Sequence, residues 1–406
     1  MSVKLKKSRA NGPMPESPAP EISNPVSEPK DTRLIREITL RNILSFGPDT
    51  PPFELKPLNV LIGANGSGKS NLICCIELMR STRTDFDQHI RDKGGVREWI
   101  GKNSPLAEGS IRLLFSESEK YSQAKEVSHE LFLNNHSNGS AFLREEFYQG
   151  ESSLDLSEYH LKVPGKSAID LANSIPNVYA LSEKNWANHQ IIYRIRLRYD
   201  DILIYKDVNV PLLRGPQRVI PDSIDIKEDF SNLTAFVKHV FNSQPRKQRL
   251  LDELQNFSES VTNFSVNSIT EDWEQLEFNE EGIKISSDRI SDGTLRYLCL
   301  LAILCNPDPP PLICIEEPEL GLHPDVLGGL AELLIEASTR TQLIVTTHSD
   351  ILVEAMTETP ESVVVCEKND GKTEMHRLTQ GEVEPWLDKY RLGELWLRGG
   401  IGGKRW

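Results

Sequence analysis

Short, continuous runs of apolar residues occur near the two ends of the chain, at 58–62, 312–315 and 342–346. Such runs are typical of strands that are buried on both faces of a parallel sheet. Segments with apolar residues at helical spacing accompany these strands and lie at 71–80, 294–304 and 324–338. The alternation of helix and strand after residue 291 predicts a mostly parallel sheet with helices on both faces, and hence an α/β fold.

The middle of the chain, from about 109 to 210, has a different pattern. Its residues alternate between apolar and polar or are rich in β-formers, and Ser137-Asn138-Gly139 is a hairpin-turn signal. We therefore expect an antiparallel β insertion with strands over 111–115, 127–133, 141–149 and 191–199. Between 232 and 264 the pattern becomes helical, without the sustained heptads of a long coiled coil.

Six prolines among Ser, Glu and Lys occupy the first 32 residues, which predicts a disordered tail. Order is expected from 33 onward, beginning with a strand over 34–40. We divide the chain into this tail, 1–32, and one head, 33–406. The head consists of two halves, 33–108 and 286–406, on either side of a β-rich and helical insertion, 109–285.

Composition and charge narrow the class of protein. The chain has 406 residues, of which 38% are hydrophobic, so it can build a large core. Lys and Arg number 46 against 60 Asp and Glu, a net charge of −14. This balance argues against a general polyanion-binding coat, but it leaves room for a local basic patch or a dedicated nucleotide-binding loop.

No apolar run reaches 18 residues, and no apolar stretch follows the basic residues at the N-terminus, so we expect neither a membrane span nor a secretory signal. The six cysteines lie in apolar runs without C-x-x-C spacing. Free thiols in a reducing compartment are the favoured interpretation, with metal ligation as the alternative. These features predict a cytoplasmic protein.

A glycine-rich segment, residues 63–70, fits the phosphate-loop pattern G-x-x-x-x-G-K-[ST] at every fixed position. An apolar strand precedes it and a helix follows it, as the pattern requires. Backbone N–H groups of such a loop surround phosphate oxygens, the lysine neutralises the β- and γ-phosphates, and the last hydroxyl binds Mg²⁺. The predicted nucleotide-binding residues are Gly63, Asn65, Gly66, Ser67, Gly68, Lys69, Ser70 and Asn71.

Two glutamates follow the apolar run 312–315 at the end of a predicted strand. Ligands bind at the carboxyl ends of parallel strands, so these side chains are expected near the phosphate loop. We assign Glu316 to Mg²⁺, together with Ser70, and Glu317 to the attacking water. Without the phosphate loop, the same residues would be an ordinary acidic turn.

Two further groups of candidate site residues are identified by their position at the end of a predicted strand or at the start of a predicted helix. His348 ends the strand 342–346 at the same sheet edge, where an imidazole can hydrogen-bond a γ-phosphate, although a lone histidine is usually structural. Ser291, Asp292 and Gly293 precede an apolar helix. They are either an N-cap with its turn or a surface that offers a hydroxyl and N–H groups to an external phosphate.

These four elements, in this order, resemble the ABC-type ATPases, in particular the RecF/SMC/OLD-like branch of DNA-associated ATPases. The segment ITLRNILSF at 38–46 also looks like that branch, as do IEEPELGLHP at 315–324 and TTHS at 346–349. The C-terminal LGELWLRG at 392–399, with Gly402, Gly403 and Trp406, looks like the tail of bacterial ATPases of this group. The resemblance implies a P-loop ABC-type head with an antiparallel β insertion and an α-helical signature subdomain.

The resemblance also implies ATP and Mg²⁺ as cofactors and a head-to-tail homodimer, or a higher oligomer built from it, around two ATP molecules. Residues 290–294 would then act on the nucleotide of the partner, and the loop 321–323 would cross the interface. Two features depart from the family: Glu316 stands where an Asp is usual, and the β-rich middle offers no clear glutamine loop. With Glu317 and His348 as catalytic residues, the implied activity is slow ATP hydrolysis.

Nucleases of the OLD family add a Toprim domain to such a head. The segment after His348 is too short for a Toprim fold of about 100 residues and has no D-x-D pair. The chain thus resembles the ATPase of two-gene bacterial anti-phage systems, which regulates a separate effector, most plausibly a nuclease.

Two other hypotheses stay open. A RecF-like repair ATPase would clamp DNA through the Arg194, Arg196 and Arg198 strand or through Arg246, Lys247 and Arg249, although such residues usually form a solvated face. A nucleotide-binding scaffold would use ATP only to hold subunits together.

Overall fold

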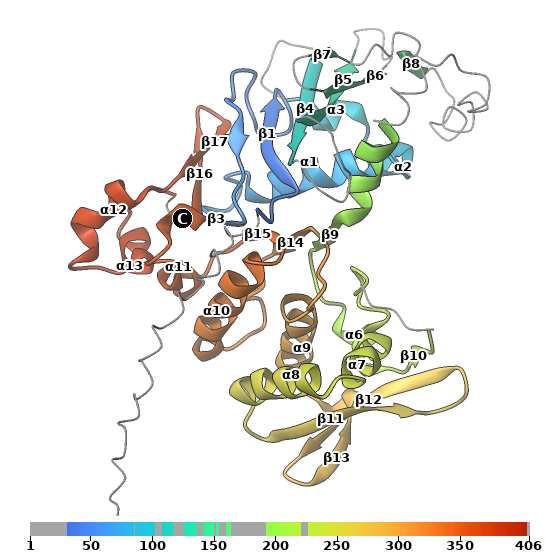
Figure 1. Cartoon of the computed structure of the whole chain (residues 1–406). Helices are drawn as coiled ribbons and strands as arrows, with labels where there is room; N and C mark the ends of the chain where they lie inside the picture. Colours follow the sequence, from blue (N-terminus) through green and yellow to red (C-terminus); the bar gives the residue numbers. More distant parts are fainter. Residues whose placement is uncertain are drawn as a thin grey trace, which may run out of the picture. The chain divides into compact units, whose positions relative to one another are not determined.

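A six-stranded, mostly parallel sheet lies at the centre of the fold (Figure 1). The computed structural model describes residues 31–84, 86–101, 108–116, 126–135, 141–149, 152–153, 160–163, 192–220 and 226–403. The sheet order is β17 (Lys372–Arg377), β16 (Val363–Asn369), β3 (Leu58–Ile62), β15 (Gln342–Thr346), β14 (Leu312–Glu316) and β9 (Ile202–Tyr205). All neighbours are parallel except β17, which pairs antiparallel with β16. The predicted strands 58–62, 312–315 and 342–346 are therefore confirmed, and they lie side by side.

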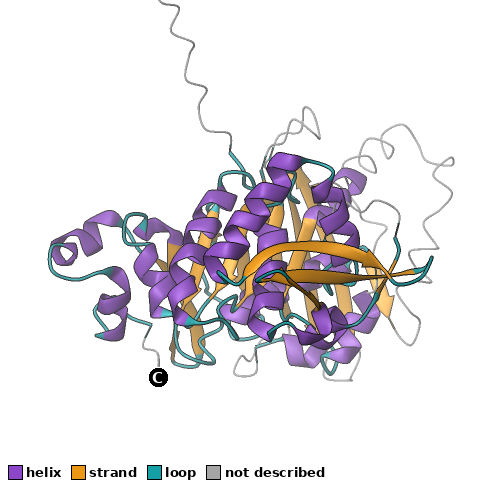
Figure 2. Cartoon of the chain, turned by 90° about the horizontal axis from the view of Figure 1, so that it is seen from below, coloured by secondary structure: helices purple, strands orange, loops and turns teal. Residues whose placement is uncertain are grey.

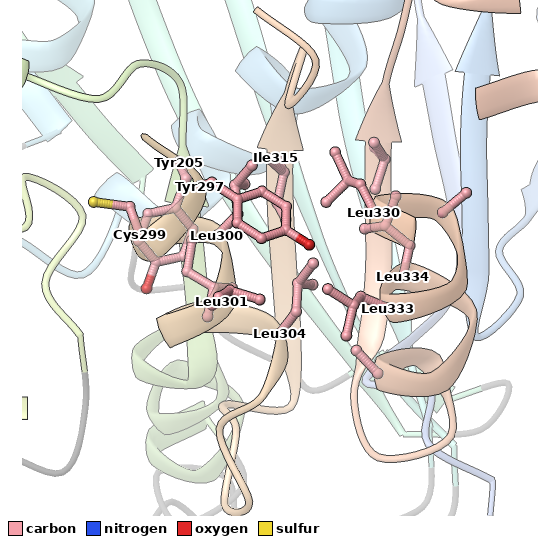
Figure 3. Close-up of a cluster of buried hydrophobic side chains, with 14 of the residues drawn as sticks. Tyr205, Tyr297, Cys299, Leu300, Leu301, Leu304, Ile315, Leu330, Leu333 and Leu334 are labelled. Carbon is pink, nitrogen blue, oxygen red and sulfur yellow. The ribbon is translucent and has the colours of Figure 1, made fainter. Parts of the chain in front are cut away.

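Two separate hydrophobic cores cover the two faces of this sheet, because successive side chains of a strand point in opposite directions. Val345 belongs to one core, together with α9 (Asp292–Leu304) and α10 (Leu327–Ser338). Figure 3 shows the leucines of both helices meeting over β14. The neighbouring Ile344 belongs to the other core, which contains the apolar face of α1 (Lys69–Ser81). Viewed from below, helices lie in front of part of the strands, and other long strands cross in front of the helices (Figure 2).

A second, antiparallel sheet shares the core on the α1 face. Its order is β2 (Phe53–Glu54), β1 (Ile35–Arg41), β4 (Glu108–Phe115), β5 (Val127–Asn135), β6 (Ala141–Gln149) and β7 (Ser152–Ser153), and β8 (His160–Val163) also pairs with β6. The short helices α2 (Phe86–Asp92) and α3 (Val96–Trp99) follow α1. The antiparallel insertion is confirmed, and its sheet also includes strands from the N-terminal half.

The predicted strand over 191–199 is wrong. The described part of this segment, 192–198, is a helix that leads through a 3-10 turn, Tyr199–Asp201, into β9. Its buried residues are Ile192, Ile195 and Arg198, and Tyr199 in the turn that follows is also buried. This spacing of three and four residues fits a helix face, and it outweighed the alternating arginines on which the strand prediction rested.

A third group of elements lies between β9 and α9. It contains α6 (Val210–Arg214), α7 (Leu233–Phe241) and α8 (Gln244–Phe257), together with the four-stranded sheet of β10 (Gln217–Arg218), β11 (Val261–Ser268), β12 (Trp273–Glu280) and β13 (Ile283–Ser286). The helical prediction holds up to Phe257. Residues 261–264, which were included in it, belong to β11 instead, because their backbone pairs antiparallel with β12.

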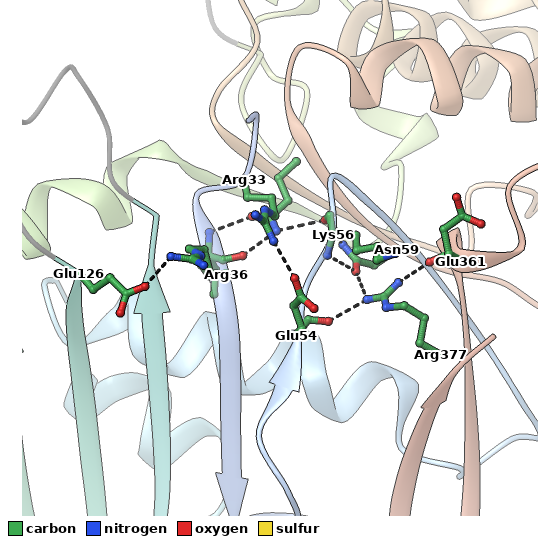
Figure 4. A network of polar contacts seen from close by, with 10 residues as sticks. Arg33, Arg36, Glu54, Lys56, Asn59, Glu126, Glu361 and Arg377 are labelled. Carbon is green, nitrogen blue, oxygen red and sulfur yellow. Dashed lines mark hydrogen bonds and ion pairs between the residues drawn. The ribbon is translucent and has the colours of Figure 1, made fainter. Parts of the chain in front are cut away.

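A polar network at the amino end of β3 joins the antiparallel sheet to the central sheet (Figure 4). The guanidinium of Arg377 in β17 donates hydrogen bonds to the Asn59 Oδ1 atom and to the Glu54 and Glu361 carbonyls, at 2.7–2.9 Å. Arg33 forms an ion pair with the Glu54 carboxylate at 2.9 Å. These contacts fix the end of the sheet that lies opposite the phosphate loop.

The C-terminal part adds α11 (Asp350–Ala355), α12 (Gln380–Leu387) and α13 (Leu392–Leu397) beside β16 and β17. Residues 32–406 form one unit by contact density. Most of the predicted N-terminal tail, 1–30, lies outside the described residues. Among the described helices, none has both the length and the apolar character needed to cross a bilayer.

Candidate nucleotide site at the carboxyl edge of the central sheet

The phosphate loop connects β3 to α1, as the sequence predicts. Gly68 caps α1 with a positive φ of 107°, and a Cβ atom there would lie 2.2 Å from the Thr373 hydroxyl oxygen. Only glycine fits this position. Ser67 and Lys69 are buried, whereas Asn65 and Gly66 are exposed at the tip of the loop. The backbone thus takes the curved shape that presents N–H groups to an anion at the start of a helix.

Lys69 is the cation of the loop. Its ammonium group donates hydrogen bonds to the Gly63 carbonyl at 2.8 Å and to the Ala64 carbonyl at 3.1 Å. Only 5% of the residue is exposed, and burial lowers the pKa of Lys69, although the nearby charges of Cys366 and Glu317 act in the opposite direction. A buried cation held by two carbonyls beside carboxylates is well placed to exchange those carbonyls for phosphate oxygens.

A second layer of hydroxyl groups supports the loop from behind. The Thr373 hydroxyl of β17 donates a hydrogen bond to the Ser67 carbonyl at 2.7 Å, and its oxygen also lies 2.7 Å from the Ser45 hydroxyl oxygen. The Asn71 side chain donates to the same Ser45 oxygen at 2.7 Å. Asn71, predicted to bind nucleotide, therefore contacts the support of the loop.

Glu316 and Glu317 lie at the carboxyl end of β14, next to the end of β15. Both are half-buried, and the Glu317 N–H donates to the Thr346 carbonyl at 2.9 Å. Glu317 has a positive φ of 46°, which is uncommon for a residue with a side chain. The structure thus brings the predicted acidic pair to the edge where the phosphate loop begins.

His348 follows β15 at this edge. Its Nε2 atom lies 3.6 Å from the Glu317 Oε1 atom, so the two predicted catalytic side chains face each other. This distance is longer than a hydrogen bond but short enough for electrostatic interaction between the imidazole and the carboxylate.

Glu319 is a site residue that the sequence analysis missed. Its Oε1 atom accepts hydrogen bonds from the Thr347 hydroxyl at 2.8 Å and from the His348 N–H at 2.6 Å. Burial raises the pKa of Glu319 above its usual range, against the effect of these hydrogen bonds. Glu319 fixes the backbone that carries His348. Its position three residues after Glu316 was the one feature of the sequence that could have identified Glu319 as a site residue.

Lys206 was also missed. It follows β9, the neighbour of β14, and lines one cavity with Arg296, Glu316 and Glu317. Burial lowers the pKa of Lys206, but its ion pair with Glu77 of α1 outweighs this effect, and the pKa is raised. A cation therefore lines the same cavity as Glu316, at the carboxyl end of the strand next to β14.

A magnesium ion is compatible with the residues present. Mg²⁺ usually binds one or two protein oxygens and completes its shell with phosphates and water. The Ser70 hydroxyl and the Glu316 carboxylate supply that kind of donor set. In the ranges that the structure describes, no group of three His, Cys, Asp or Glu side chains could hold a metal by itself, so the nucleotide would have to supply part of the shell.

The predicted nucleotide-binding residues at the start of α9, Ser291, Asp292 and Gly293, make contacts away from the phosphate loop. Ser291 caps α9, and its hydroxyl oxygen accepts a hydrogen bond from the Thr294 N–H at 3.1 Å. Asp292 pairs with Arg214, and a Cβ atom at Gly293 would lie 3.2 Å from the Gly321 carbonyl oxygen. Ser291 and Asp292 are exposed. The cap is confirmed, and the surface that carries it is open to a second molecule.

The basic residues considered for DNA binding are largely engaged within the chain. Arg196 forms an ion pair with Glu145 at 2.8 Å, and Arg198 is 2% exposed and lies over the Phe115 ring. Arg249 pairs with Glu336, and Lys247 lies over the Phe241 ring. The idea of alternating arginines on a strand is wrong, because the segment is a helix.

Comparisons with known proteins agree with this geometry. The family model described as "AAA domain, putative AbiEii toxin, Type IV TA system" matches residues 58–354. An SMC head solved with the C-terminal winged-helix domain of ScpA is 15% identical, with a TM-score of 0.58, and the match covers 86% of this chain and 99% of that one. The Pyrococcus furiosus SMC head with an extended coiled coil, bound to the C-terminal domain of ScpA, is 14% identical, with a TM-score of 0.57 and coverages of 88% and 99%. No curated protein sequence matches the chain.

Proposed function

Because the chain belongs to the family of AAA domains described as putative AbiEii toxins of a type IV TA system, and has the fold of an SMC-type ABC ATPase head, we propose that it binds and hydrolyses ATP. The observation that carries the proposal is the convergence of Lys69, Glu317 and His348 at one sheet edge. A buried ammonium, a carboxylate and an imidazole within interaction distance are the groups that hydrolysis of a phosphoanhydride requires.

In this mechanism, the N–H groups of residues 63–70 and the Lys69 ammonium bind the β- and γ-phosphates. Ser70 and Glu316 would hold Mg²⁺, which when bound would neutralise charge on the phosphates. Glu317 accepts a proton from the attacking water. His348 lies beside Glu317 and donates a hydrogen bond to the γ-phosphate. Glu319 keeps the His348 backbone in place.

We further propose that two heads close around two nucleotides. The exposed Ser291 at the start of α9 supports this idea, because a helix N-terminus with a free surface can receive the phosphate of a partner's ATP. Gly321 lies beside Gly293 and would reach the interface with it.

The proposed biological role is control of a separate effector, most plausibly a nuclease, by the ATP-dependent dimer in bacterial anti-phage defence in the cytoplasm. The toxin description of the family supports a defence role. Similar SMC heads have been solved bound to a domain of another protein.

The Glu317→Gln variant tests the ATPase. It should bind ATP with wild-type affinity, lose at least 100-fold in turnover because the base is gone, and accumulate as a dimer in light scattering with ATP. Glu358→Gln, at an exposed glutamate outside the site, is the matched control. Wild-type turnover by Glu317→Gln would contradict the assignment of Glu317, whereas nucleotide binding without turnover by either protein would favour a scaffold that only binds nucleotide. A Ser291→Arg variant should bind ATP without dimerising, and hydrolysis by that variant would refute the shared site.

A further inference from the structure

The C-terminal segment packs against the phosphate loop. Gly403 lies so close to it that a Cβ atom at this position would be 3.4 Å from the Gly63 Cα atom and 2.8 Å from a methyl carbon of Val365. Gly403 also has a positive φ of 60°. Only glycine combines this backbone conformation with the space available. A residue 340 positions away in the sequence therefore contacts the first residue of the loop.

Two hydrogen bonds hold Gly403 in this position. The Trp396 indole N–H of α13 donates to the Gly403 carbonyl at 2.6 Å, and the Gly403 N–H donates to the Glu367 Oε1 atom at 2.7 Å. Trp396 is 1% exposed. The backbone N–H and carbonyl of Gly403 thus both have side-chain partners, and the segment is held in one position.

Gly63 is also packed closely against β16, so that a side chain would not fit at this position. A Cβ atom at Gly63 would lie 2.2 Å from the Cys366 carbonyl oxygen of β16, and its φ is 145°. Its own carbonyl accepts the Lys69 hydrogen bond at 2.8 Å. Contacts therefore run from Trp396 and Glu367 through Gly403 to Gly63, and from Gly63 to the cation of the loop.

The same segment is anchored beside His348. A Cβ atom at Gly393 of α13 would lie 2.3 Å from the Asp350 carbonyl oxygen at the start of α11. The Leu392 N–H donates to the Thr357 hydroxyl at 3.2 Å. Because α11 begins two residues after His348, the segment touches both elements that flank the proposed γ-phosphate position.

We propose that residues 392–403 are a positioning element for nucleotide binding, in which Trp396 and Glu367 hold Gly403 against Gly63 and thereby set the phosphate loop. The inference rests on the proposed ATP binding. Since the loop and the segment share Gly63, docking of the segment and binding of nucleotide favour each other. Such coupling is reciprocal: the segment raises affinity for ATP, and ATP tightens the segment.

The first test measures affinity for a fluorescent ATP analogue in the full-length chain. Trp396→Phe keeps the aromatic packing but removes the N–H donor, and it should weaken binding about tenfold. Gly403→Ala should do the same by displacing the segment. The matched controls are Trp386→Phe at an exposed tryptophan and Gly381→Ala at a glycine with open space, and both should bind like wild type.

The second test is hydrogen exchange of the wild-type protein with and without ATP, which a purely structural role would not affect. ATP should slow exchange at the Gly400 and Gly403 amides about tenfold. Wild-type affinity in both segment variants, or unchanged exchange at these amides despite ATP binding, would overturn the inference. If the wild-type protein itself does not bind the analogue, the proposed ATP binding fails first, and the two failures are thereby distinguished.

Discussion

Replacing Gln342 by leucine should strongly lower the free energy of unfolding but leave ATP binding at the nucleotide site unchanged. Gln342 is the first residue of β15, is fully buried, and joins the two large sheets. Its Oε1 atom accepts hydrogen bonds from the Leu34 and Ile35 N–H groups at 3.0 and 2.9 Å, and its Nε2 atom donates to the Ile35 carbonyl at 2.8 Å. Leucine has a similar volume and makes none of these bonds.

Three buried backbone groups would lose their partners. Each unsatisfied group costs about 1–3 kcal/mol, and partial relaxation reduces the sum, so we expect a loss of about 3–5 kcal/mol in the free energy of unfolding. Urea denaturation followed by circular dichroism measures this loss as a lower midpoint. Gln248→Leu is the control, because Gln248 is exposed on α8 and bonds only to the Asp252 side chain at 2.7 Å in the described contacts. It should change stability by less than about 0.5 kcal/mol.

Gln342 lies at the opposite end of β15 from His348, so folded Gln342→Leu protein should bind ATP like wild type. A variant within about 0.5 kcal/mol of wild type would refute the reasoning that this side chain joins the two sheets. A large loss of ATP affinity in the folded variant would refute the separation of the two ends of the strand.

Two further predictions concern the site. Lys69→Met removes a positive charge that would lie about 4 Å from a phosphate. At an effective dielectric constant of about 20, this interaction contributes about 4 kcal/mol, so the affinity for ATP should fall about a thousandfold in a fluorescence titration. The control Lys368→Met, at an exposed lysine, should not change the affinity. Glu319→Gln should stabilise the unliganded protein at pH 8 but not at pH 4. The raised pKa means that wild type loses stability as the pH rises from 4.5 through the folded-state value, and glutamine does not ionise. A pH-independent difference in melting temperature would contradict this account.

The sequence predicts those parts of the site that depend on local structure. The phosphate loop, the pair Glu316 and Glu317, and His348 each stand at the end of a short apolar strand, and parallel strands gather their carboxyl ends at one edge. The order of the strands could not be predicted, because it depends on pairings between residues hundreds of positions apart.

The missed residues have distant partners. Glu319 contacts the His348 backbone, and Lys206 joins the edge only because β9, a run of four apolar residues, pairs with β14. So short a run is indistinguishable from a turn of helix by periodicity alone. The segment 192–198 shows the reverse case, in which alternating arginines favoured a strand although Ile192 and Ile195 define a helix face.

The order of the strands in the central sheet has a consequence for folding during translation. The Asn59 side chain of β3 donates a hydrogen bond to the Leu343 carbonyl of β15, 284 positions later. The strand that precedes the phosphate loop is thus translated 284 positions before the strand that lies beside it in the sheet. Long-range parallel pairing is slow and leaves strand edges exposed in the meantime. While the intervening residues are synthesised, the nascent chain therefore carries an incomplete sheet that is prone to aggregate, and this is the period in which chaperones would be of most use.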